Sequence, residues 1–166
     1  MKTEIKTQGG RLPAELRASS LVLLKRLGFN AKQHSFEEYE KAGLSPYHHA
    51  ILAVLDEGVP DTQAAIADSL GYDRGTLVGL LDELEEKGLI ERKRDPDDRR
   101  RHLVRLTSDG KRALTRLRAL AERLEDEFLA PLSAKEHETL HALLTKLASY
   151  HDPRCILRGP LNTHQG

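Results

Sequence analysis

The stretch that decides the fold is Thr62–Thr107, "TQAAIADSLGYDRGTLVGLLDELEEKGLIERKRDPDDRRRHLVRLT". Thr62 or Asp61 can cap a short helix, and Gly71 can supply the positive φ of a tight stop. Asp73 can then cap a second helix that ends at another glycine. Two short helices joined by such a turn predict a helix-turn-helix, although an ordinary helical hairpin has the same pattern.

A pair of strands is expected after the second helix, which stops at Gly88. "LIERKR" and "RHLVRLT" alternate apolar and polar residues, which is the period of a half-buried strand. Leu89 or Ile90, and Leu103 with Leu106, are the expected apolar side. The segment between them, "DPDDRR", is rich in turn formers. A hairpin that follows a helix-turn-helix predicts a winged helix.

Helical segments are expected before this unit. A helix should begin near Leu12, bend or break at Gly28, resume, and stop at Gly43. The next helix has a well-marked start, with Ser45 at the N-cap and Pro46 at the first helical position.

Two more helices are expected after the hairpin. Ser108 opens a long one that Pro131 breaks, and Ser133 with Glu136 forms a capping box for the last. Their leucines and one phenylalanine recur every three or four residues, and these are Leu114, Leu117, Leu120, Leu124, Phe128, Leu140, Leu143, Leu144 and Leu147. This is more apolar surface than one small domain can cover, so we expect a homodimer built from the N- and C-terminal helices.

The expected fold class is therefore mainly α with a small β-wing, a winged helix-turn-helix plus a helical dimerisation region. We divide the chain into an N-terminal dimerisation helix at 11–44, a winged helix-turn-helix at 45–107, C-terminal dimerisation helices at 108–151, and flexible tails at 1–10 and 152–166.

Composition bounds the function. With 26 basic and 26 acidic residues the net charge is zero, so any binding of nucleic acid must depend on local charge separation. The single cysteine, Cys155, cannot form an internal disulfide. We find no apolar signal segment and no stretch long enough to span a bilayer, which favours a cytoplasmic protein without a membrane partner.

The stretch "LEEKGLIERKRDPDDRRRHLVRLTSDGKRAL" closely resembles the signature of the multiple-antibiotic-resistance regulator (MarR) family, and the resemblance extends over Leu12 to Tyr150. It implies a dimeric DNA-binding repressor, no enzyme and no cofactor, that is often released by small phenolic or lipophilic ligands. A dimer would bind a pseudo-palindromic stretch of double-stranded DNA.

The same resemblance implies a role for the arginine-rich hairpin tip. The family carries an Asp-x-Arg pair there, which matches Asp98 and Arg100. Arginine suits a narrow minor groove because its planar guanidinium is weakly hydrated. Asp98 would orient Arg100 by a charge-assisted bond. Four further arginines are candidates for contacts to phosphates: Arg92, Arg94, Arg99 and Arg101.

The second helix of the helix-turn-helix is the candidate recognition helix. Helical geometry with Leu77, Leu81 and Leu84 inward turns Gly75 and Gly79 outward. Two glycines would let the backbone approach a major groove closely, but they remove side chains that could read bases. The flanking candidates for contacts to bases are Arg74, Thr76 and Val78, and a thymine methyl is the expected partner of Val78.

An effector site is implied by the family resemblance, between the dimer helices and the DNA-binding part. The candidates each have an apolar body, mostly with one polar group, and they are His34, Phe36, Tyr39, Tyr47 and His48. Cys155 lies far from the N-terminal helix in which the family's peroxide sensors carry their cysteine, so a thiol sensor of that type is not expected.

Two alternatives remain open. "HETLH", His137 to His141, matches the zinc-peptidase pattern, with Glu138 available to activate a water, but no third ligand follows at a familiar spacing. The two histidines could instead form a regulatory zinc site that His151 or a partner chain completes. The other alternative is a helical interaction module without DNA binding, which the zero net charge favours.

Overall fold

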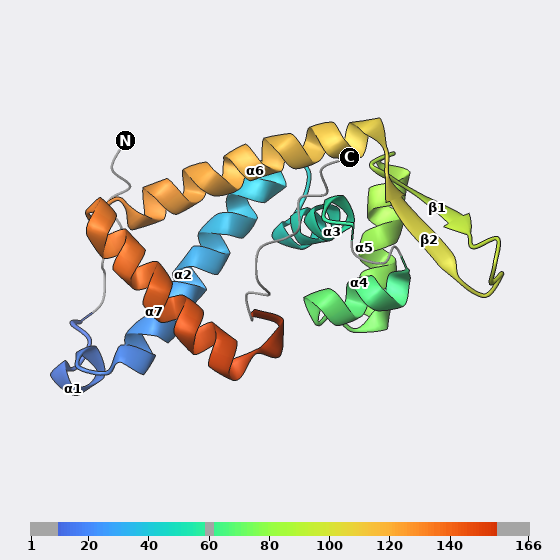
Figure 1. The fold of residues 1–166 in the computed structure, drawn as a ribbon. Coiled ribbons are helices and arrows are strands. Elements are labelled where there is room, and N and C mark those ends of the chain that lie inside the picture. The colour runs from blue at the N-terminus through green and yellow to red at the C-terminus, as the bar shows by residue number, and fades with distance from the viewer. Residues whose placement is uncertain (1–9, 59–61, 156–166) are drawn as a thin grey trace.

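The computed structural model describes residues 10–58 and 62–155 and consists mainly of helices, with one small sheet (Figure 1). Its elements in chain order are α1 (Ala14–Arg17), α2 (Ser20–Lys41), α3 (Pro46–Asp56), α4 (Gln63–Leu70), α5 (Arg74–Glu86), β1 (Ile90–Arg94), β2 (His102–Leu106), α6 (Ser108–Leu129), α7 (Ala134–His151) and the short 3-10 helix η1 (Pro153–Cys155). The fold is thus the expected one, mainly α with a β-wing. Residues 1–9 and most of the expected C-terminal tail lie outside the described residues.

The N-terminal helix differs from the prediction in two ways. It is divided near its start, where Ser19 accepts a hydrogen bond from the backbone N–H of Val22 and caps α2. The expected interruption at Gly28 is wrong, because α2 continues through it without a break. A single glycine lowers helix propensity, but 22 residues of regular hydrogen bonding outweigh that cost.

Local capping signals set the boundaries of the central helices. Ser45 and His48 form a capping box at α3, with Pro46 at the first helical position. Asp73 accepts a hydrogen bond from the N–H of Thr76 at the start of α5. Between α4 and α5 the chain turns at Gly71, whose φ of 67° is in the left-handed region. The predicted helix-turn-helix is confirmed.

β1 and β2 pair in antiparallel fashion, with Ile90 opposite Leu106 and Arg94 opposite His102. The inward side of β2 differs from the prediction, because Val104 is fully buried while Leu103 is only half-buried. Leu103 and Leu106 are three residues apart and cannot share one face of a strand, whose period is two. Leu103 instead bridges to Thr62, at the start of α4.

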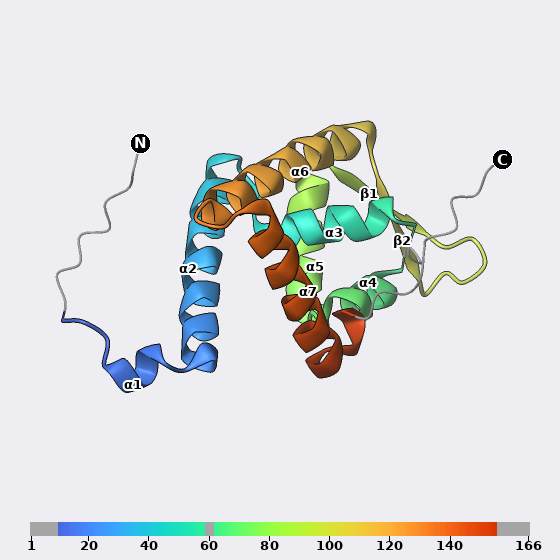
Figure 2. The same ribbon diagram turned by 60° about the vertical axis from the view of Figure 1, so that its left-hand side comes forward.

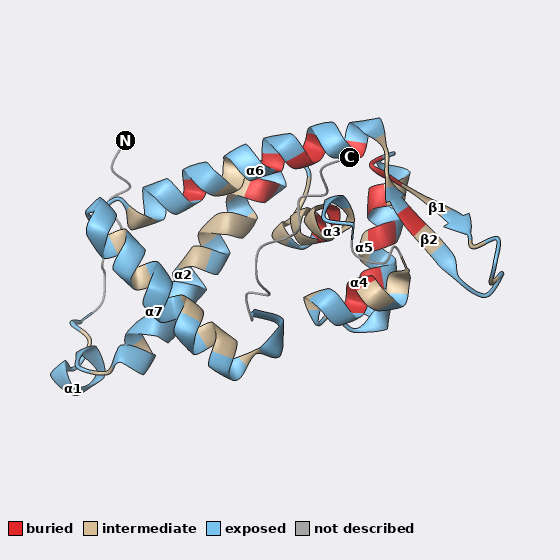
Figure 3. Ribbon diagram, viewed as in Figure 1, coloured by how far each residue is buried: buried red, intermediate tan, exposed pale blue. Residues whose placement is uncertain are grey.

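Burial divides the molecule into two regions (Figure 3). We call α3, α4, α5, the two strands and the first half of α6 the winged lobe; it contains most of the buried residues, among them Ile51, Leu52, Ile66, Leu81 and Val104. We call α2, the second half of α6 and α7 the helical arms. In Figure 1 they lie to one side of the lobe; Figure 2 shows the same helices from a second direction, and Figure 3 shows that α7 has no buried residue.

Threonine and serine caps begin the last two long helices. Thr107 accepts a hydrogen bond from the N–H of Gly110 at α6, and Ser133 and Glu136 form the predicted capping box at α7. Gly110 packs so closely on β1 that a Cβ there would lie 2.0 Å from the carbonyl oxygen of Leu89. No helix within residues 10–58 and 62–155 is long and apolar enough to cross a membrane.

Candidate nucleic-acid interface

Helix α5 has a buried face and a face turned to solvent. Leu77, Leu81 and Leu84 are at most 1 % exposed and fix the helix to the lobe. Arg74, Thr76 and Val78 are all exposed, as the sequence predicted for candidate contacts. Val78 is 42 % exposed, which is high for a valine in a folded domain.

The two glycines of the outer face have different surroundings. A Cβ at Gly75 would lie 3.3 Å from Oδ1 of Asp73, the carboxylate that caps α5. A Cβ at Gly79 would have nothing within 4 Å. Both glycines are exposed and have ordinary negative φ. The fold therefore gives a local reason for glycine at 75 and none at 79.

Arg92 connects the wing to the recognition helix. Its Nε and Nη2 donate to Glu85 Oε2 at 2.9 and 2.5 Å, and Nη2 also donates to Asp82 Oδ1 at 2.5 Å. Glu85 Oε1 additionally accepts from the backbone N–H of Arg92 at 3.2 Å. The hydrogen bond to Arg92 lowers the pKa of Glu85, and the pKa of Arg92 is raised chiefly by the same bond. Arg92 thus holds β1 against α5 and neutralises acids there, which sets it apart from the other candidate arginines.

The wing tip is braced by its own acids. Asp98 Oδ1 accepts a hydrogen bond from the backbone N–H of Arg100 at 3.0 Å, and Asp98 Oδ2 lies 3.3 Å from Nε of Arg101. Asp95 Oδ1 accepts from the N–H of Asp97 at 2.9 Å. Asp98 therefore orients Arg100 through the main chain, while its ion pair is with Arg101. Arg94, Arg99 and Arg100 are exposed.

Helix α5 and the wing frame one hollow. It measures about 450 Å³ and has the start of α4 as its third wall. Its lining residues are Thr62, Gln63, Ala64, Arg74, Leu77, Val78, Arg100, Arg101 and His102. Basic side chains from two separate elements thus converge beside the exposed Val78. This is the local charge separation that a protein of zero net charge needs in order to attract a polyanion.

The five candidate effector residues lie in four places rather than in one pocket. Phe36 of α2 and Tyr47 of α3 meet edge to face, with centroids 5.3 Å apart, and Tyr47 meets Tyr72 in the same way at 5.5 Å. Tyr72 lies in the turn directly before Asp73, the cap of α5. This aromatic triad, Phe36, Tyr47 and Tyr72, connects an arm to the start of the recognition helix.

Tyr39 of α2 and His48 of α3 are both buried, but they have different partners. Tyr39 and His49 share a 2.6 Å hydrogen bond between the hydroxyl and Nδ1, and burial raises the pKa of Tyr39 and lowers that of His49. His48 Nε2 lies 3.1 Å from Glu83 Oε2 of α5 without the alignment of a hydrogen bond. Burial lowers the pKa of His48, and the Glu83 charge opposes the shift.

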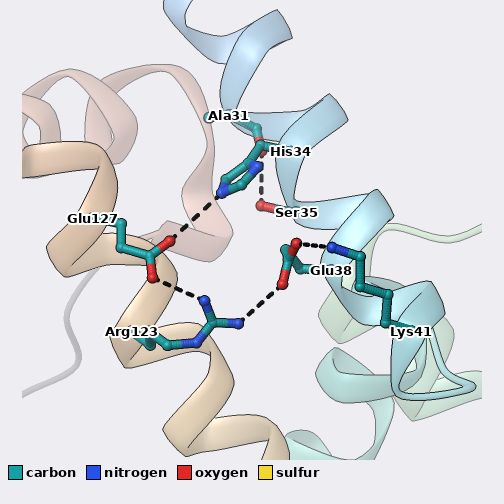
Figure 4. A network of polar contacts seen from close by, with 7 residues as sticks. All are labelled: Ala31, His34, Ser35, Glu38, Lys41, Arg123 and Glu127. Atoms are coloured by element: carbon teal, nitrogen blue, oxygen red, sulfur yellow. Dashed lines mark hydrogen bonds and ion pairs between the residues drawn. The ribbon is translucent and has the colours of Figure 1, made fainter. Parts of the chain in front are cut away.

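His34 belongs to a charged network between α2 and α6 (Figure 4). Its Nε2 lies 3.8 Å from Glu127, which also accepts from Arg123 at 2.8 Å. Arg123 reaches across to Glu38 of α2 at 3.0 Å, and Glu38 pairs with Lys41. The hydrogen bonds from Lys41 and Arg123 lower the pKa of Glu38. This network links the two arms within one protomer.

A large apolar groove opens between α2, α6 and α7, with a volume of about 1060 Å³. Its apolar lining includes Leu24, Leu27, Phe128, Leu132, Leu140, Leu143 and Leu144. Nearby, Leu21, Phe29 and Tyr150 are 75 %, 68 % and 84 % exposed. The arms therefore display the apolar stripe that the sequence predicted, uncovered within one protomer.

The "HETLH" motif lies on α7. His137 Nε2 is 3.4 Å from Glu125 Oε1 of α6, and His141 and His151 are exposed. Within the described ranges, no group of three or more His, Cys, Asp or Glu side chains is placed to hold a metal ion.

Sequence reasoning did not identify three of these contacts: Tyr72 in the triad, His49 beside Tyr39, and the binding of Arg92 to Asp82 and Glu85. Tyr72 could have been found, because a large aromatic residue next to a helix cap is unusual in an exposed turn. The other two depend on how helices and strands cross, which sequence patterns do not encode.

Together, the capped helix pair, the exposed outer face of α5 and the arginine-tipped hairpin define a winged helix-turn-helix protein. Residues 42–101 match the model of the MarR family. The DNA-bound transcriptional repressor CouR, known from Rhodococcus jostii, shares 32 % identity over 84 % of this chain and 99 % of that one, with a TM-score of 0.74. The chain belongs to the MarR family of transcriptional regulators.

Two other relatives agree with this placement. The PcaV regulator of Streptomyces coelicolor, solved with its natural ligand, is 28 % identical over 86 % of this chain and all of that one, with a TM-score of 0.68. A Thauera aromatica protein assigned as a transcriptional regulatory protein for the hcr operon is 37 % identical over 105 residues. That match covers 63 % of each chain, slightly less than two thirds of the Thauera protein.

Proposed function

We propose that this regulator is a homodimeric repressor that binds a pseudo-palindromic DNA operator and is released by a small aromatic or lipophilic ligand. The observation that carries the proposal is the hollow between α5 and the wing, where Arg74, Val78 and Arg100 converge. The CouR structure, a repressor bound to a 23-mer DNA duplex, supports it. An operator-binding role also favours the expected cytoplasmic location.

In the proposed complex, α5 enters the major groove and the wing follows the adjacent minor groove. Arg100 enters the minor groove, and Arg94, Arg99 and Arg101 contact phosphates. Thr76 and Val78 face bases, with Val78 against a thymine methyl. Arg92 keeps its bonds to Asp82 and Glu85, so we assign it to holding the wing at a fixed angle to α5 rather than to a phosphate.

The homodimer follows from the uncovered arms. Covering apolar side chains stabilises an assembly by about 25 cal/mol per Å² removed from water, and a second copy offers the same apolar stripe in return. We propose that residues 11–44 and 108–151 supply this interface through the uncovered faces of the arms, while residues 45–107 bind DNA. Two recognition helices related by a two-fold axis would then face half-sites about one helical turn apart.

We assign the effector site to the aromatic triad. PcaV was solved with its natural ligand, so ligand binding occurs in the fold. In this chain Phe36, Tyr47 and Tyr72 offer aromatic faces and two hydroxyl groups, which suit a phenolic ligand. Because Tyr72 precedes the cap of α5, a ligand that displaces it would change the orientation of the recognition helix.

Fluorescence anisotropy with the DNA upstream of the protein's own gene, across a salt series, tests the proposal. Arg100→Ala should weaken binding at least about tenfold and reduce the salt slope by about one. Arg116→Ala removes the same charge from the exposed side of α6 and should change binding little. Unchanged affinity and salt slope for Arg100→Ala would contradict the wing assignment, and footprinting with and without phenolic acids would test release.

A further inference from the structure

The α5 helix has a residue whose identity the folded chain does not explain. Glycine is the least favourable residue in a helix interior after proline, and it lowers the folded-to-unfolded ratio about fivefold relative to alanine. Gly79 is in the middle of α5, is exposed, has negative φ, and has nothing within 4 Å of a built Cβ. Neither a turn nor close packing within the protein requires glycine there.

Gly28 of α2 likewise has nothing within 4 Å of a built Cβ, but it lines the apolar groove of the arms, whereas the two remaining helical glycines have close neighbours. Gly110 is in contact with the backbone of Leu89, and Gly75 lies beside the capping carboxylate of Asp73, so both have neighbours that restrict a side chain. Gly79 is on the outer face of α5, next to Val78, which lines the hollow with Arg100. A requirement for glycine at 79 must therefore come from a surface outside the protein.

We infer that Gly79 is a specificity-determining residue, at which the main chain of α5 lies directly against DNA. This inference rests on the proposed function. Without a Cβ, the surface at Gly79 is the apolar Cα, and the neighbouring Val78 is also apolar. The C5-methyl of thymine is the apolar group that base edges offer in the major groove. The position therefore selects a thymine in each half-site, by admitting its methyl group where any side chain would collide.

Charge along α5 agrees with this placement. Arg74 begins the helix, whereas Asp82 and Glu86 follow Gly79 on the same outer face. Asp82 is neutralised by Arg92, but Glu86 is exposed near the C-terminal end. Repulsion between these acids and phosphates favours entry by the first two turns, which include Gly79.

The test is a set of alanine variants measured for both stability and binding. Gly79→Ala should raise the Tm by about 2–4 °C and yet lower operator affinity about tenfold or more. Thr115→Ala is the matched control, since it places alanine at an exposed position of α6, away from the hollow. It should also raise the Tm slightly, with affinity unchanged.

Replacing thymidine by deoxyuridine, which lacks the C5-methyl group, tests whether that methyl group is recognised. Each thymine of the footprinted operator is replaced in turn, and one position per half-site should weaken binding of the unsubstituted protein about fourfold. Gly79→Ala should not respond to that replacement. The inference is overturned if Gly79→Ala gains stability and binds as tightly as the unsubstituted protein, or if it keeps the thymine dependence. If the unsubstituted protein shows no salt-dependent DNA binding, the proposed function itself fails.

Discussion

The winged lobe and the helical arms have similar local signals but opposite degrees of burial. Both begin their helices with well-formed caps, such as Asp73 at α5 and Ser133 at α7. In the lobe the buried residues of α3, α4 and α5 form a common core, whereas α7 has no buried residue (Figure 3), and its Leu143 and Leu147 remain 56 % and 50 % exposed. Secondary structure is thus specified locally in both regions, but only the lobe completes its core within one chain.

The difference also shows what holds the arms in place. Ion pairs near the surface, such as Arg123 with Glu38, link α2 to α6, and such pairs stabilise little. The lobe is held by close packing of aliphatic side chains, each worth several times as much. The stability of the lobe should therefore depend on its own core, whereas the arrangement of the arms should depend on a second copy of the chain.

The largest effect is expected from a cavity in the lobe. Leu81→Ala removes a fully buried side chain from α5 and should lower the free energy of unfolding by about 2–5 kcal/mol. Chemical denaturation at fixed protein concentration measures this. Leu132→Ala, at a partly exposed position between the two arm helices α6 and α7, serves as the comparison and should cost much less. Equal losses at the two sites would remove the distinction between lobe and arms.

The second prediction concerns the proposed dimer interface on the arms. Leu143→Glu combined with Leu147→Glu puts two carboxylates on the uncovered face of α7 and should raise the dimer dissociation constant about a hundredfold or more. Analytical ultracentrifugation measures the constant. Lys146→Glu adds a carboxylate to the same helix and should change it far less. A double variant that sediments like the unsubstituted protein would show that α7 is not in the interface.

The third prediction compares two glycines. Gly110→Ala drives a Cβ into the carbonyl of Leu89, so that the junction of β1 and α6 must shift, at a cost of about 1–3 kcal/mol. Gly79→Ala meets open space and should stabilise the protein by up to about 1 kcal/mol. Thermal unfolding should therefore separate the two variants in opposite directions. Shifts of the same sign would mean that the packing around one of these helices is different.

The elements of the lobe could be predicted because their signals are local. Ser45, Gly71 and Asp73 each mark a boundary through their own hydrogen bonds or φ, which short stretches of sequence specify. The prediction that Leu103 and Leu106 form the inward side of β2 was wrong, because residues three apart share a face of a helix but not of a strand. The break at Gly28 was wrong because propensity was given more weight than the long regular helix around it.

The candidate site was predictable in its residue types but not in its tertiary contacts. Exposure of Arg74, Val78 and Arg100 follows from helix period and turn chemistry. The fixing of Arg92 to Glu85 does not, because it depends on where β1 crosses α5. Tertiary contacts also explain why the effector candidates lie in separate places and why Tyr72, which was not a candidate, contacts Tyr47. The DNA contacts themselves stay predictions.

The smallest effect concerns the pH dependence of the lobe. Burial lowers the pKa of His48 below its ordinary value of 6.5, so between those two pKa values the unfolded chain binds more protons than the folded one. Stability is then full above pH 6.5 and falls as the pH drops through that window. Nδ1 of His48 accepts from the N–H of Ser45 in the capping box, so a second ring proton would also displace this bond.

His48→Gln separates this contribution, since glutamine at the same position can keep the capping box. Thermal unfolding from pH 7.5 to pH 5 should show a smaller loss of Tm for the variant than for the unsubstituted protein. The pKa of the half-buried His49 is lowered in the same direction, which leaves a residual slope in both proteins. His141→Gln, at an exposed position of α7, should keep the full slope, because the arms bury no histidine there. If the Tm of His48→Gln falls with pH as steeply as that of the unsubstituted protein, proton binding by His48 does not govern the pH dependence of the lobe's stability.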